Sequence, residues 1–147
     1  MFFEIICPDS IAICKSDNGY YIKSLKNFDI GDIIFSNESI LFNVSETPIV
    51  TVAVNSTIFD LDMLMHTVNR DNNIREFYGF DTFTNHHCDP NTAVILHDQT
   101  HYDVVAIKKI NKGDELFQDY DTFDSKLDKT TFMCNCGFTK CKKIIYG

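Results

Sequence analysis

Basic residues are in the minority in this sequence, which has 13 Lys and Arg against 21 Asp and Glu and a formal net charge of −8. A surface that binds nucleic acid needs a basic patch, so this balance argues against direct binding to DNA or RNA. An acidic chain is better suited to attract a basic partner, such as a peptide rich in Lys and Arg.

Long hydrophobic runs are also missing. The first residues, MFFEIICPDS, have no basic segment before the apolar ones, and Glu4 interrupts the apolar run. This stretch therefore predicts neither a secretory signal peptide nor a membrane span. No other stretch approaches the roughly 18 consecutive apolar residues of a membrane-spanning helix. We expect a soluble protein of the cell interior that has no contact with a membrane.

The pattern of apolar residues favours one mostly β domain. The chain has 147 residues, 44% of them apolar and 13% aromatic, which suits a single folded domain and argues against disorder. Short runs of β-branched and aromatic residues, separated by turn residues, predict many short strands and little helix. The clearest pair is a hairpin formed by residues 92–97 and 102–107, joined by DQTH.

Two stretches interrupt this series of strands. The first has helical spacing, with Asp60 as the predicted N-cap of a helix that carries Leu61, Leu64, Met65 and Val68 on one face. The second, RDNNIREF at 70–77, is polar and predicts a loop.

The six cysteines are unevenly placed. Inside a cell they are expected to be thiols or metal ligands and not disulfides. Cys7 and Cys14 lie in apolar runs, where a thiol behaves as a small buried hydrophobe. The other four fall in two motifs, with Cys88 in NHHCDPN (85–91) and Cys134, Cys136 and Cys141 in CNCGFTKC (134–141).

The C-terminal motif has the spacing C-x-C-x4-C, which is typical of a zinc-binding knuckle. Structural zinc takes four tetrahedral ligands, usually thiolate or imidazole, and this motif offers three. Cys88 is the obvious fourth ligand, with His86 or His87 as substitutes; the alternative is three incidental cysteines. A nucleophile built from Cys88 and a neighbouring histidine is disfavoured, because catalytic pairs meet through the fold and a thiolate on zinc is not a free nucleophile.

Taken together, these motifs resemble those of the SET-domain protein lysine methyltransferases. NHHCDPN matches the family's Asn-His-Ser-Cys-x-Pro-Asn motif at Asn85, His86, Cys88, Pro90 and Asn91, with His87 in the position of Ser. GDELFQDY (113–120) matches the motif Gly-Glu-Glu-Leu-x-x-x-Tyr, and CNCGFTKC matches the zinc motif that follows the domain, called post-SET. KSDNGYYIKSLKNFDIGDIIF resembles the segment that opens a SET domain, so the resemblance runs from about Ile11 to Ile145.

The resemblance implies a fold and a metal site. The fold is mostly β, a SET domain of several short-stranded sheets in which the C-terminal strand passes under a loop to form a pseudoknot. The SET domain would cover residues 1–125, and the zinc-binding post-SET tail residues 126–147. The zinc ligands of the family correspond to Cys88, Cys134, Cys136 and Cys141.

The resemblance also implies an activity, methyl transfer from S-adenosylmethionine to a lysine side chain of a basic protein, with histone tails favoured. The enzyme would then act in the nucleus, which for a viral or bacterial protein is the nucleus of the host cell. The cytoplasm is the alternative location. A free lysine has a pKa of ~10.4, and desolvation beside a cationic sulfonium lowers it so that a neutral amine can react. Tyr120 matches the catalytic tyrosine of the family. The expected cofactor-binding residues are Gly19, Tyr20, Tyr21, Asn85, His86, Tyr120 and Phe138.

Three positions depart from the family pattern. Tyr21 stands where the family has the second glycine of a Gly-x-Gly turn, and Thr82 stands where it often has an arginine. Gln118 stands where it usually has Phe or Tyr. Because alternate residues of a strand share a face, Gln118 is expected to line the lysine channel with Tyr120 and to favour mono- or dimethylated product. The alternative is that Gln118 faces solvent at a strand edge.

Two other functions compete with the enzyme. One is a non-catalytic SET-like module that is folded by zinc and binds basic peptides, and the other is a purely structural zinc protein. Tyr120 and the complete central motif favour the enzyme over both.

Overall fold

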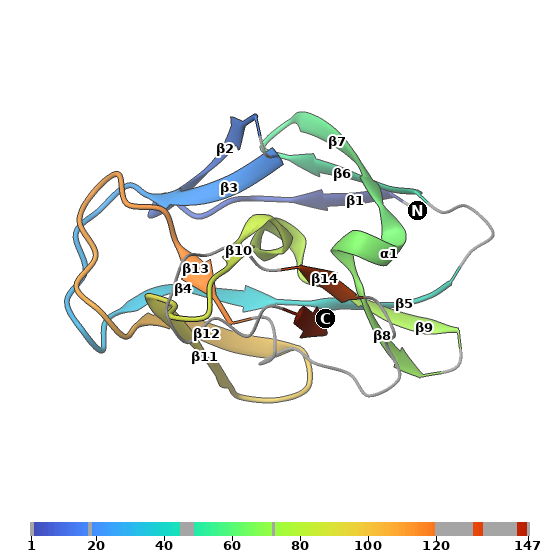
Figure 1. The fold of residues 1–147 in the computed structure, drawn as a ribbon. Helices are drawn as coiled ribbons and strands as arrows, with labels where there is room; N and C mark the ends of the chain where they lie inside the picture. Colours follow the sequence, from blue (N-terminus) through green and yellow to red (C-terminus); the bar gives the residue numbers. More distant parts are fainter. Residues whose placement is uncertain are drawn as a thin grey trace.

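The computed structural model describes residues 2–17, 19–44, 49–71, 73–119, 131–133 and 144–146 of the chain. Most of these residues are in short strands (Figure 1). In chain order the elements are β1 (Phe2–Ile5), β2 (Ile11–Ser16), β3 (Gly19–Ser24), β4 (Ile33–Glu38), β5 (Ile40–Asn43), β6 (Ile49–Val54), β7 (Thr57–Asp62), α1 (Met63–His66), β8 (Val68–Asp71), β9 (Ile74–Phe77), the 3-10 helix η1 (Gly79–Phe83), β10 (Asn85–His86), β11 (Thr92–Leu96), β12 (His101–Ala106), β13 (Phe117–Gln118), β14 (Thr131–Met133) and β15 (Ile144–Tyr146).

The strands form several small sheets, as expected for a mostly β chain. Three of the sheets have three strands, in the orders β1-β6-β7, β11-β12-β4 and β5-β9-β8. The others are the pairs β2-β3, β10-β13 and β14-β15. The predicted hairpin is confirmed, since β11 and β12 pair antiparallel from Thr92 opposite Ala106 to Leu96 opposite Tyr102.

The core lies between these sheets and follows from their sequences. β6 is the central strand of its sheet, parallel to β1 and antiparallel to β7, and its run IVTVAV is almost continuously apolar. A strand with neighbours on both sides and little solvent contact needs such a run. The largest side chains that are almost fully buried include Tyr102, Phe77, Ile22, Ile110 and Leu116. They come from three strands and two connecting segments, so one core joins the sheets.

The predicted helix at 61–68 is wrong in extent. Leu61 belongs to β7, where it pairs with Val50 and is buried, and the α-helix covers only Met63–His66. Pairing with β6 and burial of Leu61 override the helical spacing, as tertiary contacts often override local propensity.

The predicted loop at 70–77 is also wrong, because these residues form most of the hairpin β8–β9. Two of its charged residues, Arg75 and Glu76, are buried with partners. Arg75 Nε donates to Thr67 Oγ1 at 2.6 Å, and Glu76 accepts from Ser39 Oγ at 2.6 Å. A buried charge is tolerated when it is hydrogen-bonded, so polarity did not exclude a strand here.

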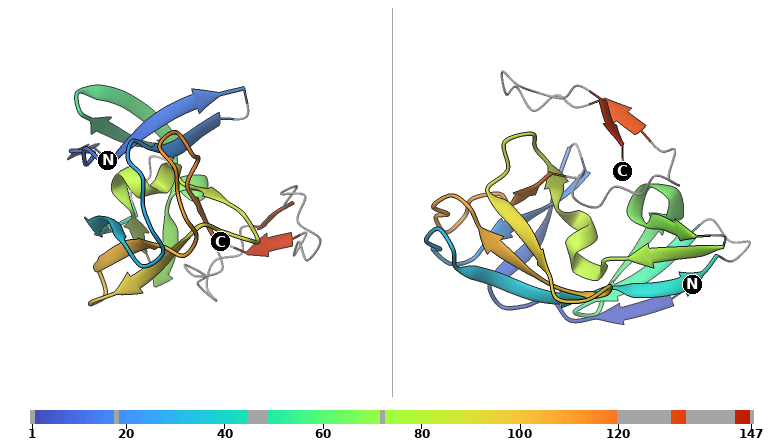
Figure 2. Two further views of the ribbon diagram at one scale, coloured as in Figure 1. Left: turned by 90° about the vertical axis from the view of Figure 1, so that its left-hand side faces the viewer. Right: turned by 90° about the horizontal axis from the view of Figure 1, so that it is seen from below.

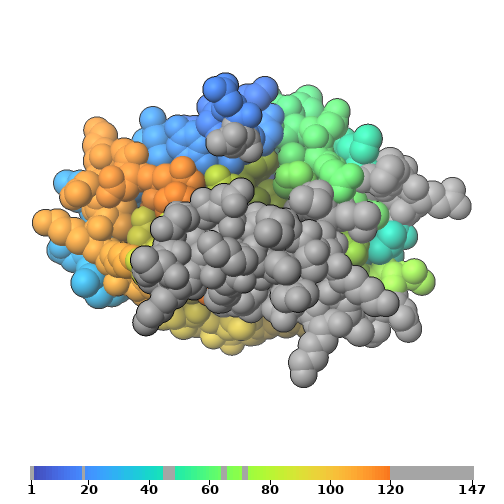
Figure 3. All heavy atoms as spheres, viewed as in Figure 1, coloured from blue at the N-terminus to red at the C-terminus, as the bar shows by residue number. Residues whose placement is uncertain are grey.

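Figure 2 shows how the elements lie in space. The antiparallel strand pair β14–β15 lies on one side of the body, and β1 and β4 lie on the opposite side in its right-hand view. On the face drawn in Figure 3, the residues of β2 and β3 and the segment that leads to Asp119 are neighbours. Within the described residues, no helix is long and apolar enough to cross a membrane.

Candidate active site

The central motif and the segment before Tyr120 lie side by side. β10 and β13 pair in parallel, with Asn85 opposite Phe117 and His86 opposite Gln118. The next residue continues the ladder, since the His87 N–H donates to the Gln118 carbonyl at 3.0 Å. Two motifs that are some thirty positions apart in sequence therefore form one structural unit (Figure 1).

Residues at the end of the central motif bind segment 115–118 from the opposite side. The Asn91 amide accepts the Phe117 N–H at 2.8 Å and donates to the Glu115 carbonyl at 2.9 Å. Thr92 Oγ1 donates to the Phe117 carbonyl at 2.6 Å. Segment 115–118 is thus bounded by residues 85–87 and 91–92, which agrees with a strand that passes under the loop of the central motif.

β3 reaches the same place from the N-terminal part of the chain. Asn85 Nδ2 donates to the Tyr20 carbonyl at 3.1 Å and to Glu115 Oε2 at 3.2 Å. The Leu116 N–H donates to the Ile22 carbonyl at 2.8 Å. Gly19, at the start of β3, has φ +115°, and a Cβ there would meet no atom within 4 Å. The fold therefore brings together Gly19, Tyr20 and Asn85, three of the residues predicted to bind the cofactor.

The side chains of Tyr20 and Tyr21 go to different surroundings. The Tyr20 ring packs edge-on against Phe59 and Phe83, with centroids 5.2 and 5.3 Å away. Tyr21 lies opposite Cys14 on β2, and the charge and hydrogen bond of that thiol raise the pKa of Tyr21. Successive residues of a strand point to opposite faces, so only one of the two rings can face a given ligand.

His86 and Cys88 are in contact. His86 Nε2 lies 3.3 Å from Cys88 Sγ, and its Nδ1 lies 3.8 Å from Asp119 Oδ1. The His86 side chain is buried, with 2% of it exposed, and Cys88 is half-buried. Among the residues that the structure describes, no group of three His, Cys, Asp or Glu could hold a metal ion. The other predicted ligands Cys134, Cys136 and Cys141, together with Tyr120 and Phe138, lie outside the described residues.

His87 and Thr82, both at positions where the family has another residue, make structural contacts. The His87 ring packs edge-on against Phe117 at 5.2 Å, and its Nδ1 accepts the Asp89 N–H at 2.9 Å. Thr82 Oγ1 donates to the His66 carbonyl at 2.9 Å and so ties η1 to α1. These contacts stabilise the turn of the central motif and the segment that leads into it.

Gln118 belongs to a buried polar cluster. Only 3% of Gln118 is exposed, so the interpretation that it faces solvent is wrong. Gln118 Nε2 lies 2.9 and 3.1 Å from the two carboxylate oxygens of Asp81. Asp81 also accepts from Tyr102 Oη at 2.6 Å and from Thr84 Oγ1 at 2.7 Å. Burial raises the pKa of the Asp81 carboxyl, while the three hydrogen bonds act in the opposite direction.

Asp81 was not predicted from the sequence. The signal that could have found it is a single acidic residue within the aromatic stretch FYGFDTF, just before the central motif. A carboxyl in an apolar stretch must find hydrogen bonds when it is buried, which makes it a marker of a polar cluster.

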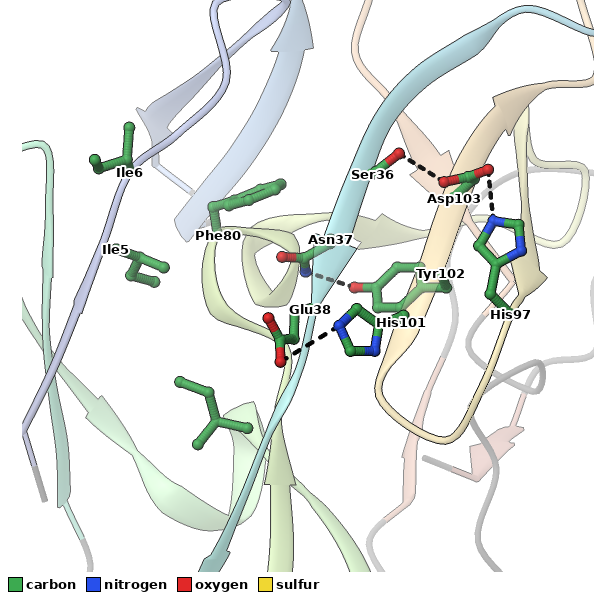
Figure 4. Close-up of a pocket in the computed structure, with 11 residues that line it drawn as sticks. Ile5, Ile6, Ser36, Asn37, Glu38, Phe80, His97, His101, Tyr102 and Asp103 are labelled. Carbon is green, nitrogen blue, oxygen red and sulfur yellow. Dashed lines mark hydrogen bonds and ion pairs between the residues drawn. The ribbon is translucent and has the colours of Figure 1, made fainter.

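A separate cavity of about 800 Å³ lies between β1, β4 and β12 (Figure 4). His97 contacts Asp103 at 2.7 Å and His101 lies 3.4 Å from Glu38 along its wall. None of the residues predicted to act in catalysis, cofactor binding or metal binding lines this cavity. Tyr102 lines this cavity and also donates a hydrogen bond to Asp81 of the polar cluster.

Comparison with known proteins identifies the family. The SET domain family matches residues 19–121. The histone-lysine N-methyltransferase EHMT1 of Mus musculus is 28% identical over 138 residues, which cover 86% of this chain and 10% of that protein. Human histone-lysine N-methyltransferase 2B is 32% identical over 66 residues, which cover 43% of this chain and 2% of that protein. The chain therefore matches a tenth or less of the length of these relatives.

Solved structures share the fold. A candidate histone methyltransferase of Plasmodium falciparum superposes with a TM-score of 0.54 at 21% identity, covering 78% of this chain and 95% of that one. KRYPTONITE, solved with mCHH DNA, an H3(1–15) peptide and SAH, superposes with a TM-score of 0.57 at 18% identity, covering 92% of this chain and 29% of that one. At these identities the likeness concerns the arrangement of the strands.

Proposed function

Because the chain belongs to the SET-domain family, we propose that it transfers a methyl group from S-adenosylmethionine to the side-chain amine of a lysine in a protein. The observation that carries this proposal is the parallel pairing of β10 with β13. It sets Asn85 and His86 of the central motif directly beside the residues that precede Tyr120. Asn85 and His86 could then bind the cofactor at the same site to which Tyr120 would bring its catalytic hydroxyl.

The cofactor would lie along the first residues of β3 and β10. S-adenosylmethionine supplies a methyl group that is already activated by the adjacent sulfonium, so the protein mainly has to align the reactants. Gly19 offers open backbone, and the Asn85 side chain fixes β3 against β10. Asn85, His86 and the backbone of Tyr20 would provide the polar contacts, and Tyr21 and Phe138 would add apolar cover.

Tyr120 would act on the lysine amine. Its position two residues after Gln118 corresponds to the catalytic tyrosine of the family. In a desolvated channel the neutral form of the amine is favoured, because removal from water penalises the ammonium. The Tyr120 hydroxyl would orient the lone pair of the amine toward the methyl group, and Gln118 would help to shape the channel.

The substrate would be a basic segment of a protein, and a histone tail is the favoured candidate. The net charge of −8 is suited to a Lys-rich peptide. The relatives EHMT1 and 2B are named as histone-lysine N-methyltransferases, and the KRYPTONITE structure contains an H3 peptide. A histone substrate would require the enzyme to act in a nucleus. The acidic net charge of −8 does not favour direct binding of the chain to nucleic acid.

Zinc would hold the C-terminal residues against the SET domain. The proposed ligands are Cys88, Cys134, Cys136 and Cys141, with residues 1–125 as the SET domain and 126–147 as the post-SET tail. Four thiolates are a common donor set for structural zinc. Cys88 supports this role because it is half-buried and follows β10 at the edge of the site.

A methyltransferase assay tests the proposal. The full chain would be incubated with labelled S-adenosylmethionine and either histones or an extract of other proteins, and the product lysines would be located by mass spectrometry. We expect label on lysine with the wild type and almost none with Tyr120→Phe. Peptide binding with no methyl transfer under any of these conditions would instead support the non-catalytic module.

A further inference from the structure

The cavity of Figure 4 lies between the edges of two sheets. Among the strands that the structure describes, β1 pairs with β6 alone and β4 pairs with β12 alone, so both are edge strands. In Figure 1, β6 lies beyond β1 and β12 lies beyond β4, so the two unpaired edges face each other. Ser10 Oγ covers the first part of the β4 edge, since it donates to the Ile34 carbonyl at 2.9 Å. The cavity follows the rest of this edge, at residues 36–38, and we call it the β1–β4 groove.

The residues at the start of η1 form the floor of the groove. On the side of β1, a Cβ at Gly79 would lie 3.3 Å from Ile5 Cδ1. On the side of β4, Asn37 Nδ2 donates to the Tyr78 carbonyl at 2.7 Å. Phe80 lines the groove between them. Because this floor contacts both strands, it keeps the two edges apart and leaves space for a third strand.

Neither strand has the residues that normally protect an edge. The sequences are FFEI for β1 and IIFSNE for β4, without Lys or Pro. Natural proteins often place these two residues on edge strands, because an unprotected edge is a template for pairing with another chain. Extended peptides bind to exposed sheet edges in this way. The groove is therefore suited to an extended segment of a protein.

The charged groups around the groove favour a basic segment. Three carboxylates lie in the groove or at its rim, those of Glu38, Asp98 and Asp103. They are close to two histidines, His97 and His101. None of the eleven described residues that line the groove is Lys or Arg. The three carboxylates outnumber the two histidines even when both rings are protonated, so the charge remains negative. Opposite charges across an interface favour and orient a partner, here a basic one.

We propose that the β1–β4 groove binds an extended segment of a partner protein, in which basic side chains alternate with apolar ones. Successive side chains of a strand point to opposite faces. The apolar side chains would pack on Ile5 and Phe80, and the basic ones would reach Glu38, whose side chain is 67% exposed. None of the residues proposed for catalysis, cofactor binding or zinc binding lines this groove, so the inference does not rest on the proposed methyl transfer.

A fluorescently labelled peptide of alternating arginine and valine tests the proposal. Arginine supplies the charge without offering a lysine for methylation. We expect saturable binding to the full chain, measured by fluorescence anisotropy. The same peptide with glutamate in place of arginine should bind at least about tenfold more weakly, because its charges repel the carboxylates. N-methylation of alternate backbone nitrogens should weaken binding similarly, because it removes the N–H groups along one edge of the peptide.

Two variants with matched controls locate the site. Glu38→Lys should weaken binding of the arginine peptide at least about fivefold by reversing a charge in the groove. Asp29→Lys makes the same change of net charge at an exposed position outside the lining, and its affinity should equal that of the wild type. Ile6→Ser removes an apolar side chain at the rim, where Ile6 is 82% exposed, and should also weaken binding. Its control is Ile58→Ser on β7, where Ile58 is 66% exposed. All four changes are at exposed positions, so the melting temperature should stay close to that of the wild type.

A photo-crosslinker in place of one valine shows where the peptide lies. Crosslinks to β1, β4 or η1 support the proposal, and crosslinks confined to β3, β10 or β13 place the peptide at the proposed active site and overturn it. Equal affinity for the arginine and glutamate peptides, or wild-type affinity in Glu38→Lys, also overturns it. Self-association of the chain that Glu38→Lys abolishes, seen by sedimentation, would make a second copy the occupant and the peptide proposal wrong. None of these measurements needs methyl transfer, so failure of the inference is distinct from failure of the proposed function.

Discussion

The Asn91 side chain forms hydrogen bonds with the backbone around Phe117 in the way that a neighbouring strand would. Its side-chain amide accepts the Phe117 N–H at 2.8 Å and donates to the Glu115 carbonyl at 2.9 Å. The last residue of the central motif thereby provides, from one side chain, the two hydrogen bonds of a strand edge. Pro90 before it has no N–H and a fixed φ, which suits a turn that must present this amide.

Asn91→Ala should therefore destabilise the site region strongly. The substitution leaves the Phe117 N–H and the Glu115 carbonyl without partners in a partly buried place, which costs about 1–3 kcal/mol for a lost buried partner. The free energy of unfolding would be measured with urea. Asn27→Ala is the control, because Asn27 accepts the Lys112 N–H at 2.7 Å at an exposed position. Equal losses for the two variants would contradict the role of Asn91.

Tyr120→Phe should reduce turnover far more than it reduces affinity for the cofactor. The hydroxyl aligns the reacting amine, and removal of a positioned catalytic group typically costs about 100-fold or more. Turnover and cofactor affinity would be measured on the same preparation. Activity of the wild type should rise with pH as the substrate amine becomes neutral.

Wild-type turnover in Tyr120→Phe would require another hydroxyl. Tyr78 is a poor replacement, because its hydroxyl contacts the guanidinium of Arg70, and burial raises its pKa. Tyr20→Phe and Tyr21→Phe would then be assayed in the same way, since both residues lie on β3 beside Asn85.

The zinc proposal predicts one tightly bound Zn²⁺ per chain. Structural zinc contributes on the order of 10 kcal/mol of apparent binding free energy in small domains. Cys136→Ser or a chelator should therefore abolish cofactor binding and leave most of the β core folded. Metal content would be determined by elemental analysis, with Cys14→Ser as the control that retains the metal. Purified protein without zinc, or a disulfide among Cys88, Cys134, Cys136 and Cys141, would refute the proposal.

The sequence predicted strands well where the apolar pattern is local. β6 and the hairpin β11–β12 follow directly from runs of β-branched residues. It failed at β8–β9 because Arg75 and Glu76 look like loop residues until their partners are known. Glu76 is buried against Ser39, which is 37 positions away. Such a contact has no trace in the local pattern of apolar residues.

The same reason explains which parts of the site could be predicted. Short motifs predicted Asn85, His86 and Asn91, because their residues are neighbours in sequence. Asp81 was missed because its meaning depends on Tyr102 and Gln118, which are 21 and 37 positions away. Gln118 was recognised as an unusual residue, but its burial and its partner could be learned only from the fold.

The last prediction concerns the pH dependence of stability that Asp81 causes. Burial raises the pKa of this carboxyl in the folded protein above its ordinary value of 3.8. Between the unfolded and the folded pKa the native state binds more protons than the unfolded state, so unfolding releases protons and the free energy of unfolding falls as pH rises. Below 3.8 both states are protonated, and Asp81 contributes no pH dependence.

Urea unfolding at a series of pH values from about 3 upward would measure this effect. Other carboxyl groups also titrate in this range, so the informative quantity is the wild-type free energy of unfolding minus that of Asp81→Asn. This difference should decrease as pH rises above 3.8 and become constant once Asp81 is ionised in the folded protein. Asp89→Asn is the control, because Asp89 is paired with Lys108 at 2.6 Å on an exposed turn. A difference for Asp81 that is flat, or that grows with pH, would mean that its three hydrogen bonds outweigh burial and that the folded state prefers the carboxylate.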